Sequence, residues 1–528
     1  VANTATEIAG QGRVNAVAID PNNPSILYVG APAGGIWKST DDGVNWTPLA
    51  DHLPQIGVSG IAIDPNDSDI IYISTGDDDA GDSYSIGVLK STDGGVSWNT
   101  TGLSFDYTWR GSNEIFIDPT NSNIIWVATS EGVYKSTDAG NNWTLIVSGD
   151  IDDLRLKPGY PNTLYAASPQ DGSTPSKFYK ITGGGTSVVE ISSGVPTDSK
   201  RFAIEVTEAD ASVVYLLSTY DNGEDSYRGE NAFQGVYKST DSGATFTKTL
   251  ESDDIFNSGQ SWFDMALTVS DTDPNTVFVG VLDIWKSTDG GDNFSQINSW
   301  SNHNQAFTHA DIHFMRYFDG VLYAGSDGGI YRSSDDGVNF EDLSTNLSIA
   351  QIYTISVAKT NSNKIAGGLQ DCGGFAFANN TWNSYHGGDG MGTAIDPSNE
   401  DHYYGFTQYG GGLYLTSSAG TGNTQFIASS PTDGEWVTPL VFNKNSDLYA
   451  GYDQLYVLKE SGWNQVSNHS FSGTLDQIEI DPTNNNIMYV SEGNSLFKSA
   501  DRGQTFTNIL STSYNIRSIE VHHTDSNI

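Results

Sequence analysis

The stretch Ser39–Trp46, with the sequence STDDGVNW, decides the fold because close variants of it recur along the whole chain. In every variant an Asp follows the Ser by two positions, a Gly follows by four and an aromatic residue by seven. The Asp carboxylate accepts backbone N–H bonds in a tight turn, and Gly adopts positive φ without strain. The phrase therefore predicts a hairpin, which recurs from Ser91, Ser136, Ser239, Ser287, Ser333 and Ser499.

The sequence around each hairpin predicts short strands. Apolar residues alternate with others, as at Val14, Ala16 and Ala18, and an Asp-Pro turn such as Asp20-Pro21 separates two such runs. Adjacent phrases lie about 45–52 residues apart, which leaves room for four strands in each repeat. Degraded copies occur near Gly183–Gly185, Gly373, Ser418 and Glu460, so the chain holds eleven complete repeats and the start of a twelfth. Repeats of this length and content predict an all-β fold, a β-propeller of four-stranded blades.

The number of rings is a separate question. We predict a first propeller of about seven blades over residues 1–345. A second propeller, over residues 346–528, would hold about four and a half blades and continue beyond Ile528. The alternative is one large ring of ten or more blades.

Composition excludes several classes of protein. The 528 residues contain 65 Asp and Glu against 24 Lys and Arg, a net charge of −41, with 11% aromatic residues. Nucleic acids and anionic membrane surfaces require clustered cations, so neither is an expected partner. No apolar run is long enough to predict insertion into a bilayer. One cysteine, Cys372, excludes an internal disulfide framework and has no nearby partner that suggests a thiol nucleophile.

The repeated phrase resembles the Asp-box (BNR) repeat of sialidases, of glycoside hydrolase family 74 xyloglucanases, of sortilin-type VPS10 domains and of a photosystem II assembly factor. The resemblance covers nearly the whole chain and implies a propeller, but these families range from hydrolases to receptors. In them the boxes lie at the blade periphery. The resemblance therefore implies a structural role for the Asp-box residues Asp41, Asp93, Asp138, Asp241, Asp289, Asp335 and Asp501.

Longer phrases resemble secreted Bacteroidota proteins that carry type IX secretion signals. They include THADIHF from Thr308, GSDGGIY from Gly325 and GGLQDCGG from Gly367. Such proteins more often have Asn where this chain has Cys372. The resemblance, together with a chain that opens at Val1, implies a secreted or cell-surface bacterial protein. It also implies export by type IX machinery through a C-terminal domain outside the given sequence.

The densest polar phrase is His309-Ala310-Asp311-Ile312-His313. If it forms a strand, His309, Asp311 and His313 point to one face, and Asp327 in the next hairpin adds a carboxylate. Three interpretations stay open: a hydrogen-bonded network on an inner strand, a ligand-binding or catalytic site with Asp311 as the catalytic candidate, or a metal site.

Glycines surround two further acids, in Gln370-Asp371-Cys372-Gly373-Gly374 and in Gly387-Gly388-Asp389-Gly390. Glycines allow the backbone to approach a ligand and expose an isolated carboxylate. Paired carboxylates cleave glycosidic bonds, so Asp371 and Asp389 are the best catalytic pair, with Gln370 as a ligand-binding neighbour. The other interpretation is a pair of structural turns or an ion site.

Two more groups of residues are candidates for binding. The insertion with Asp77, Asp78, Asp79 and Asp82 offers clustered oxygen ligands that suit Ca²⁺, or it is a solvated loop. We expect no cofactor to be required, and calcium is the one ion that the insertion suits. Aromatic rings outside the repeated phrase would stack on sugars or on neighbouring blades, and the ligand-binding candidates among them are Trp109, Trp262 and Tyr409.

Two functions follow from these observations. The first is a secreted binding protein without catalysis that recognises a polysaccharide or a protein. The alternative is a glycoside hydrolase of the xyloglucanase type, acting on β-glucan in a cleft between two propellers with an Asp/Asp acid–base pair. A sialidase is disfavoured, because the chain lacks the Arg-Ile-Pro phrase of that family.

Overall fold

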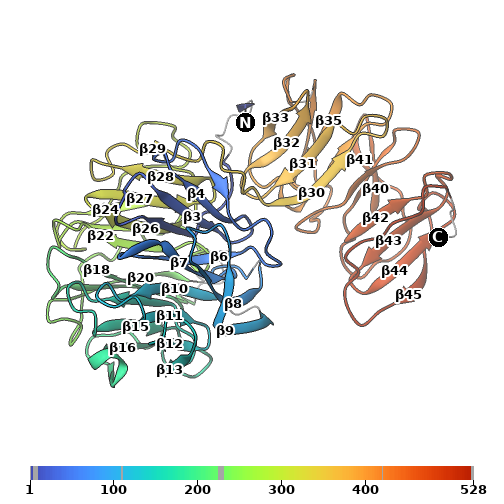
Figure 1. The fold of residues 1–528 in the computed structure, drawn as a ribbon. Coiled ribbons are helices and arrows are strands. Elements are labelled where there is room, and N and C mark those ends of the chain that lie inside the picture. The colour runs from blue at the N-terminus through green and yellow to red at the C-terminus, as the bar shows by residue number, and fades with distance from the viewer. Residues whose placement is uncertain are drawn as a thin grey trace. The chain divides into compact units, whose positions relative to one another are not determined.

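A computed structural model describes residues 2–3, 10–81, 83–108, 111–223, 231–418 and 420–524. The chain divides into two compact units (Figure 1). Gln11–Ile349 forms one, which we call the seven-sheet unit, and Ala350–Ile528 together with Val1–Gly10 forms the other, the four-sheet unit. Within the described residues the only helices are two short 3₁₀ turns, η1 (Gly183–Gly185) and η2 (Gln408–Gly410). None of the described helices has the length and apolar character needed to cross a bilayer.

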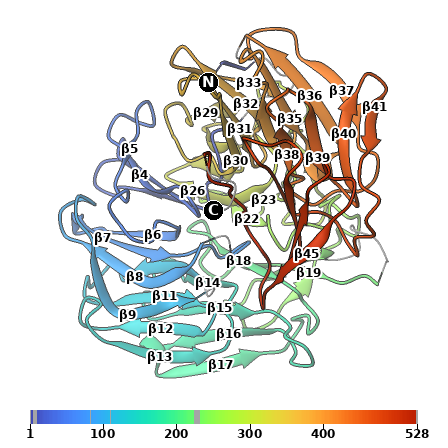
Figure 2. The same ribbon diagram turned by 90° about the vertical axis from the view of Figure 1, so that its right-hand side faces the viewer.

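The seven-sheet unit consists of consecutive four-stranded antiparallel sheets, each built from neighbouring strands in chain order. The first three sheets are β2 (Ala16–Ile19), β3 (Leu27–Ala31), β4 (Gly35–Ser39) and β5 (Thr47–Pro48); β6 (Val58–Asp64), β7 (Asp67–Thr75), β8 (Ser85–Ser91) and β9 (Asn99–Thr108); and β10 (Ser112–Ile117), β11 (Ile125–Thr129), β12 (Gly132–Ser136) and β13 (Trp143–Ser148). The fourth and fifth are β14 (Asp153–Leu156), β15 (Leu164–Ser168), β16 (Lys177–Thr182) and β17 (Ser187–Ile191); and β18 (Phe202–Val206), β19 (Val214–Tyr220), β20 (Ala232–Ser239) and β21 (Thr247–Lys248). The last two are β22 (Ala266–Val269), β23 (Val277–Gly280), β24 (Ile284–Ser287) and β25 (Ser295–Gln296); and β26 (Ile312–Phe318), β27 (Val321–Ser326), β28 (Gly329–Ser333) and β29 (Glu341–Asp342). Figure 2 shows successive sheets following one another around the unit.

The four-sheet unit repeats the same plan. Its first sheet contains β30 (Ile352–Val357), β31 (Ile365–Leu369), β32 (Gly373–Ala378) and β33 (Thr381–His386), and β1 (Ala2–Asn3) adds parallel to β33. The others are β34 (Thr393–Ile395), β35 (His402–Phe406), β36 (Gly412–Ser417) and β37 (Gln425–Ser429); β38 (Leu440–Phe442), β39 (Leu448–Gly451), β40 (Leu455–Lys459) and β41 (Gly462–Gln465); and β42 (Gln477–Ile480), β43 (Met488–Glu492), β44 (Ser495–Ser499) and β45 (Thr507–Ser511).

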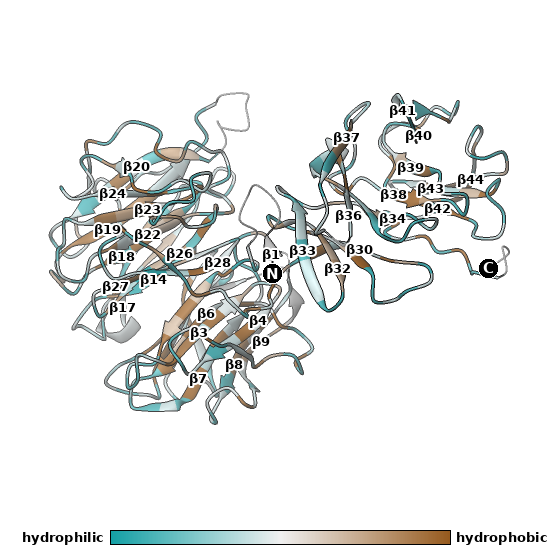
Figure 3. Ribbon diagram, turned by 90° about the horizontal axis from the view of Figure 1, so that it is seen from above, coloured by the Kyte–Doolittle hydropathy of each residue, from teal (hydrophilic) through white to brown (hydrophobic). Residues whose placement is uncertain are grey.

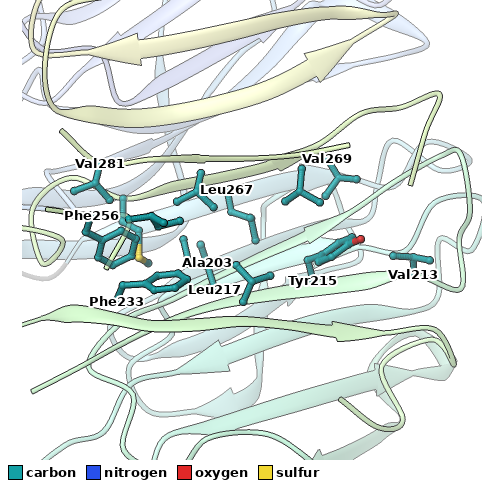
Figure 4. Packing of buried hydrophobic residues seen from close by; sticks show 14 residues of the cluster. Ala203, Val213, Tyr215, Leu217, Phe233, Phe256, Leu267, Val269 and Val281 are labelled. Atoms are coloured by element: carbon teal, nitrogen blue, oxygen red, sulfur yellow. The ribbon is translucent and has the colours of Figure 1, made fainter. Parts of the chain in front are cut away.

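The core lies between the faces of successive sheets. Apolar residues fill the central strands, which are brown in Figure 3. One cluster joins the fifth sheet to the sixth, and Figure 4 shows Tyr215 and Leu217 from β19 facing Leu267 and Val269 from β22. Central strands such as β3 and β11 bury side chains on both faces because their sheets are enclosed by the sheets before and after them, whereas outer strands such as β17 are exposed.

The last sheet of the seven-sheet unit packs against the first. The Val14 N–H donates to the Ser326 carbonyl at 3.0 Å, and the Trp46 indole N–H donates to the Leu343 carbonyl at 2.8 Å. Val17 shares a buried apolar cluster with residues of β26 and β27. The seven sheets therefore close on themselves, which removes the two open sheet faces that a linear stack would expose.

The repeated hairpins share one hydrogen-bond pattern. In the first, the Ser39 hydroxyl donates to Asp41 and accepts the Gly43 N–H, while the Asp41 carboxylate accepts the Asn45 N–H at 2.9 Å. These bonds to the charged form lower the pKa of Asp41 below its ordinary value. The carboxylates of Asp93, Asp138, Asp241, Asp289, Asp335 and Asp501 accept the equivalent bonds.

A lysine before many of these hairpins reaches the next sheet. Lys135 donates to the Gly184 carbonyl at 2.7 Å, and its ammonium lies 4.9 Å from the centre of the Trp126 ring. Lys38, Lys90, Lys180 and Lys286 donate to carbonyls of the hairpin in the following sheet. In the last sheet Arg332 occupies the same position and pairs with Asp42 of the first sheet at 2.6 Å. This series of cations links the sheets around the seven-sheet unit.

Replacing Lys135 by Met should lower the free energy of unfolding by about 1–2 kcal/mol, because a charged hydrogen bond and a cation–π contact are lost while the aliphatic stem remains. Thermal unfolding followed by circular dichroism measures the change. Lys135→Arg retains the charge and should recover at least half of the loss. If both variants have the melting temperature of the parent, the contact of Lys135 contributes nothing to stability.

The all-β propeller fold predicted from the repeats is confirmed. We retain two predictions as proposals: that residues 1–345 and 346–528 are separate domains, and that the four sheets of the second are part of a larger ring.

Candidate functional site

The best-formed candidate site lies in the four-sheet unit, at the turn between β31 and β32. Asp371 occupies this turn with φ 51°, in the left-handed region that residues other than Gly, Asn and Asp rarely adopt. Its side chain is partly exposed. Asp tolerates this region better than most residues do, so the turn suits the residue present.

Asp389 holds the turn of Asp371. One oxygen of the Asp389 carboxylate accepts the backbone N–H of Asp371 at 2.8 Å, and the other accepts from the Gln408 side chain at 2.7 Å. The residue is only 5% exposed. Gly390 permits the close approach, because a Cβ there would lie 2.1 Å from the Gly373 carbonyl oxygen. Asp389 therefore positions Asp371 and is poorly placed to act as the second catalytic carboxylate that the sequence suggested.

His386 fixes the start of the turn that carries Asp389. Its Nδ1–H donates to the Gly387 carbonyl at 3.0 Å, and its ring stacks on Tyr414 with the centres 5.2 Å apart. Burial disfavours the charged imidazolium and lowers the pKa of His386 to about 4. His386 is therefore neutral at physiological pH and serves as a rigid support.

Two exposed rings lie beside this hydrogen-bond chain. Tyr409 follows Gln408 in η2, has φ 57° and is 52% exposed. Its ring meets the ring of Trp436 edge to face, with centres 5.1 Å apart, and Trp436 is 39% exposed. The predicted ligand-binding residues Gln370 and Tyr409 thus lie in the same unit as Asp371 and Asp389. Sequence reasoning missed Gln408, because no local pattern distinguishes it.

A second group of predicted residues comes together in the seven-sheet unit. The two ring nitrogens of His313 lie 2.8 Å from Asp79 and 2.8 Å from Asp327, and its side chain has no solvent exposure. Burial disfavours the imidazolium, but Asp327 and Asp79 together raise the pKa of His313 to about 9. His313 is thus a buried cation between two carboxylates, and ligand binding by His313 and Asp327 stays a prediction.

The predicted stripe of His309, Asp311 and His313 is wrong. Strand β26 begins only at Ile312, and Asp311 has φ 63°, so the alternation of a strand does not extend back to His309. Asp311 instead accepts from the Gln260 side chain at 2.5 Å. The physical reason is local: the chain turns at Asp311, where the Asp327 N–H donates to its carbonyl at 3.2 Å.

Asp264, which sequence reasoning missed, is the acid beside Asp311. Burial, and then the neighbouring charge of Asp311, raises the pKa of Asp264 well above its ordinary value. Gln260 donates to both carboxyl groups, at 3.2 Å to Asp264 and 2.5 Å to Asp311. The negative charge of Asp311 therefore disfavours the ionised form of Asp264.

The predicted calcium residues Asp77 and Asp79 have cationic partners within the protein. Arg13 pairs with Asp77 at 2.6 Å, and Arg201 pairs with Asp79 at 2.5 Å. Asp78 is exposed on the same loop. Asp82 lies outside the described residues. Calcium binding by this loop stays a prediction, although these cations already balance two of its four carboxylates.

The other sequence-predicted residues divide between accessible and enclosed places. Trp262 is 50% exposed and lines a cavity of about 480 Å³ beside Asp77–Gly81, whereas Trp109 lies outside the described residues. A cavity of about 90 Å³ reaches His313 and Asp79. This volume is far below the roughly 300–1,000 Å³ of ligand pockets, so the cavity is too small for a polysaccharide. His309 is partly buried, with its Nδ1 near the Ala310 carbonyl.

The ion pairs of His313 predict a dependence of stability on pH. The pKa rises from about 6.5 in the unfolded chain to about 9, so this contribution is complete below pH 6.5 and is lost as pH rises through 9. The melting temperature should therefore fall by several degrees between pH 7.5 and pH 10. His313→Gln should melt lower at pH 7.5 and show a smaller fall. If the melting temperatures of the two proteins fell equally between pH 7.5 and pH 10, the prediction that His313 is charged in the folded protein would be wrong.

Comparisons with known proteins bear on the activity of these sites. No family model matches the chain. A curated protein of Hypocrea jecorina is 23% identical over 637 residues, covering 94% of this chain and 75% of the relative. One from Paenibacillus is 26% identical over 336 residues, 55% of this chain and 32% of the relative. One from Acetivibrio thermocellus is 26% identical over 353 residues, which cover 57% of this chain and 40% of the relative.

All three are named xyloglucanases. The chain spans three quarters of the length of the first relative and less than half of the other two. These names contradict our main functional prediction, a binding protein without catalysis, and favour the alternative. The prediction was wrong because the repeated turns dominate the sequence, whereas a residue with a role at one turn leaves no repeated signal.

Solved structures agree on the fold. The GH74 enzyme of Niastella koreensis superposes with a TM-score of 0.64 at 18% identity, over 96% of this chain and 79% of that one. The GH74 xyloglucanase of Xanthomonas campestris gives a TM-score of 0.67 at 15% identity, over 96% and 80%. At such low identity the likeness establishes the propeller architecture alone.

Proposed function

We propose that this protein is a glycoside hydrolase that cleaves a β-glucan of the xyloglucan type, with Asp371 as a catalytic carboxyl group. The observation that carries the proposal is the turn of Asp371, where a partly exposed carboxyl is held in left-handed backbone by the buried Asp389. The names of the curated relatives support the choice of substrate.

Hydrolysis of a glycosidic bond needs a carboxyl group placed firmly against the scissile oxygen or the sugar ring. Asp389 restrains the backbone of Asp371, because its carboxylate accepts the Asp371 N–H. The reaction also needs a second carboxyl group. Asp311, in the seven-sheet unit, stays a separate catalytic prediction from the sequence.

The proposed substrate has a consequence for location. A large, water-soluble polysaccharide does not cross the membrane of an intact cell, so we infer that the protein acts outside the cell that makes it. A bacterial source, attachment to the cell surface and export through the type IX machinery stay predictions.

The test is to incubate the purified protein with xyloglucan, unsubstituted mixed-linkage β-glucan and xylan, and to follow new reducing ends. We expect release from xyloglucan at a rate at least tenfold above that from xylan. Asp501→Asn, in a repeated hairpin of the same unit, is the matched control and should retain the parent rate. The absence of new reducing ends from all three polymers would refute the proposal.

A further inference from the structure

Tyr409 and Trp436 form an exposed aromatic pair that packing does not explain. Tyr409 is 52% exposed and Trp436 is 39% exposed, although rings of this size are normally buried. The ring of Tyr353 in turn meets Trp436 edge to face, with centres 6.4 Å apart. We call Tyr409 and Trp436 the aromatic platform.

The platform is held by backbone bonds. The Tyr409 N–H donates to the Trp436 carbonyl at 3.3 Å, and the Gly434 N–H donates to the Tyr409 carbonyl at 3.2 Å. The buried Tyr452 hydroxyl donates to the Gly410 carbonyl at 2.9 Å. Gly410 has φ 64°, and a Cβ there would lie 2.8 Å from the Tyr452 ring, so the turn accepts only Gly. A surface whose backbone is fixed in this way loses little entropy when a ligand binds.

The same short turn reaches the candidate catalytic residue. Gln408, the residue before Tyr409, donates to Asp389, and Asp389 accepts the N–H of Asp371. Gln408 thus joins the turn that carries Tyr409 to the residue that holds Asp371. Two functions, an exposed ring surface and support for a carboxyl, are combined in adjacent residues.

We propose that the aromatic platform binds a pyranose ring of a neutral polysaccharide, and that Gln408 couples this subsite to the position of Asp371. The apolar face of a pyranose carries C–H groups that pack on the π-face of Tyr or Trp, and its hydroxyls remain in water. The proposal rests on the proposed function for Asp371, and it adds a specificity-determining pair and a positioning residue.

The platform is tested by binding as well as by activity. Tyr409→Ala and Trp436→Ala should each raise the KM for xyloglucan by about tenfold and change kcat by less than threefold, because they remove binding that is equal in ground and transition states. Tyr514→Ala is the control, since Tyr514 lies in the same unit and is 84% exposed. Unchanged KM in both platform variants would refute the subsite.

For Gln408 we expect an effect on kcat and not on KM. Gln408→Ala should lower kcat about tenfold or more with little change in KM, as expected for a residue that acts through Asp389. The double variant with Asp389→Asn should lose no more than Asp389→Asn alone, because both act through one contact. Additive losses, or a change confined to KM, would refute the coupling.

Calorimetric titration with xyloglucan oligosaccharides separates this proposal from the proposed function. If the parent protein binds the oligosaccharides and Trp436→Ala binds at least tenfold more weakly, the platform stands even when no hydrolysis is found. If the parent hydrolyses xyloglucan and Trp436→Ala has the same affinity and KM, the hydrolase stands and the platform is wrong.

Discussion

The Asp371→Asn variant should hydrolyse xyloglucan about 10²–10⁴-fold more slowly than the parent, the range expected when a positioned acid or base is removed. The amide cannot exchange a proton or carry a full charge, yet it has nearly the shape of the carboxyl. Asn also tolerates the left-handed backbone at this position, so the turn should remain folded. The measurement is kcat from initial rates of reducing-end release at saturating xyloglucan.

Three further variants make this result specific. Asp371→Ala removes the same carboxyl but adds backbone strain, so it should be equally inactive and melt at a lower temperature. Asp389→Asn should retain more activity than Asp371→Asn, because Asp389 acts only through position. Asp311→Asn tests the other candidate. If Asp371→Asn keeps more than a third of the parent kcat, Asp371 is not catalytic, whatever the other variants do.

The second large effect concerns stability. Arg13→Met should lower the free energy of unfolding by about 3–5 kcal/mol, the usual result of leaving one member of a buried ion pair alone. Arg13 and Asp77 are both almost completely buried, and their charged atoms lie 2.6 Å apart. The Arg13 guanidinium also lies 4.9 Å from the centre of the Phe263 ring. A loss of this size should lower the melting temperature by roughly 5–10 °C.

The double variant Arg13→Met/Asp77→Asn separates charge from packing. With no charge left to bury, it should recover more than half of the lost stability. Lys177→Met is the matched surface control, since Lys177 pairs with Glu190 at 3.4 Å where both side chains are exposed to water, and it should cost less than about 1 kcal/mol. Equal losses in the single and double variants would show that the packing of Arg13, and not its charge, is responsible.

The fold was predictable because its deciding contacts are local. Ser39, Asp41 and Asn45 close one hairpin within seven residues, so the same letters produce the same turn wherever they recur. Repetition then multiplies this signal. Strand boundaries within a repeat follow from the same turns, which is why the sheets appear where the phrases place them.

The sites were less predictable because their contacts are distant. His313 meets Asp79 across 234 positions of sequence, and Gln260 joins Asp311 across 51. Nothing near His313 indicates that its charge is balanced from the second sheet. Asp371 and Asp389 were found through their glycines, which mark backbone that must approach closely. Their division of roles needed the hydrogen bond between them.

The hydrogen bond between Val14 and Ser326 can form only after most of the seven-sheet unit has been synthesised. At about 5–20 residues per second, roughly 15–60 s separate the two residues at the ribosome. Throughout that interval the apolar face of the first sheet, including Val17 and Val29, has no cover from β26 and β27. A nascent chain of this protein must therefore be protected from aggregation until its last sheet has emerged, and release before Ser326 would leave that face permanently open to other chains.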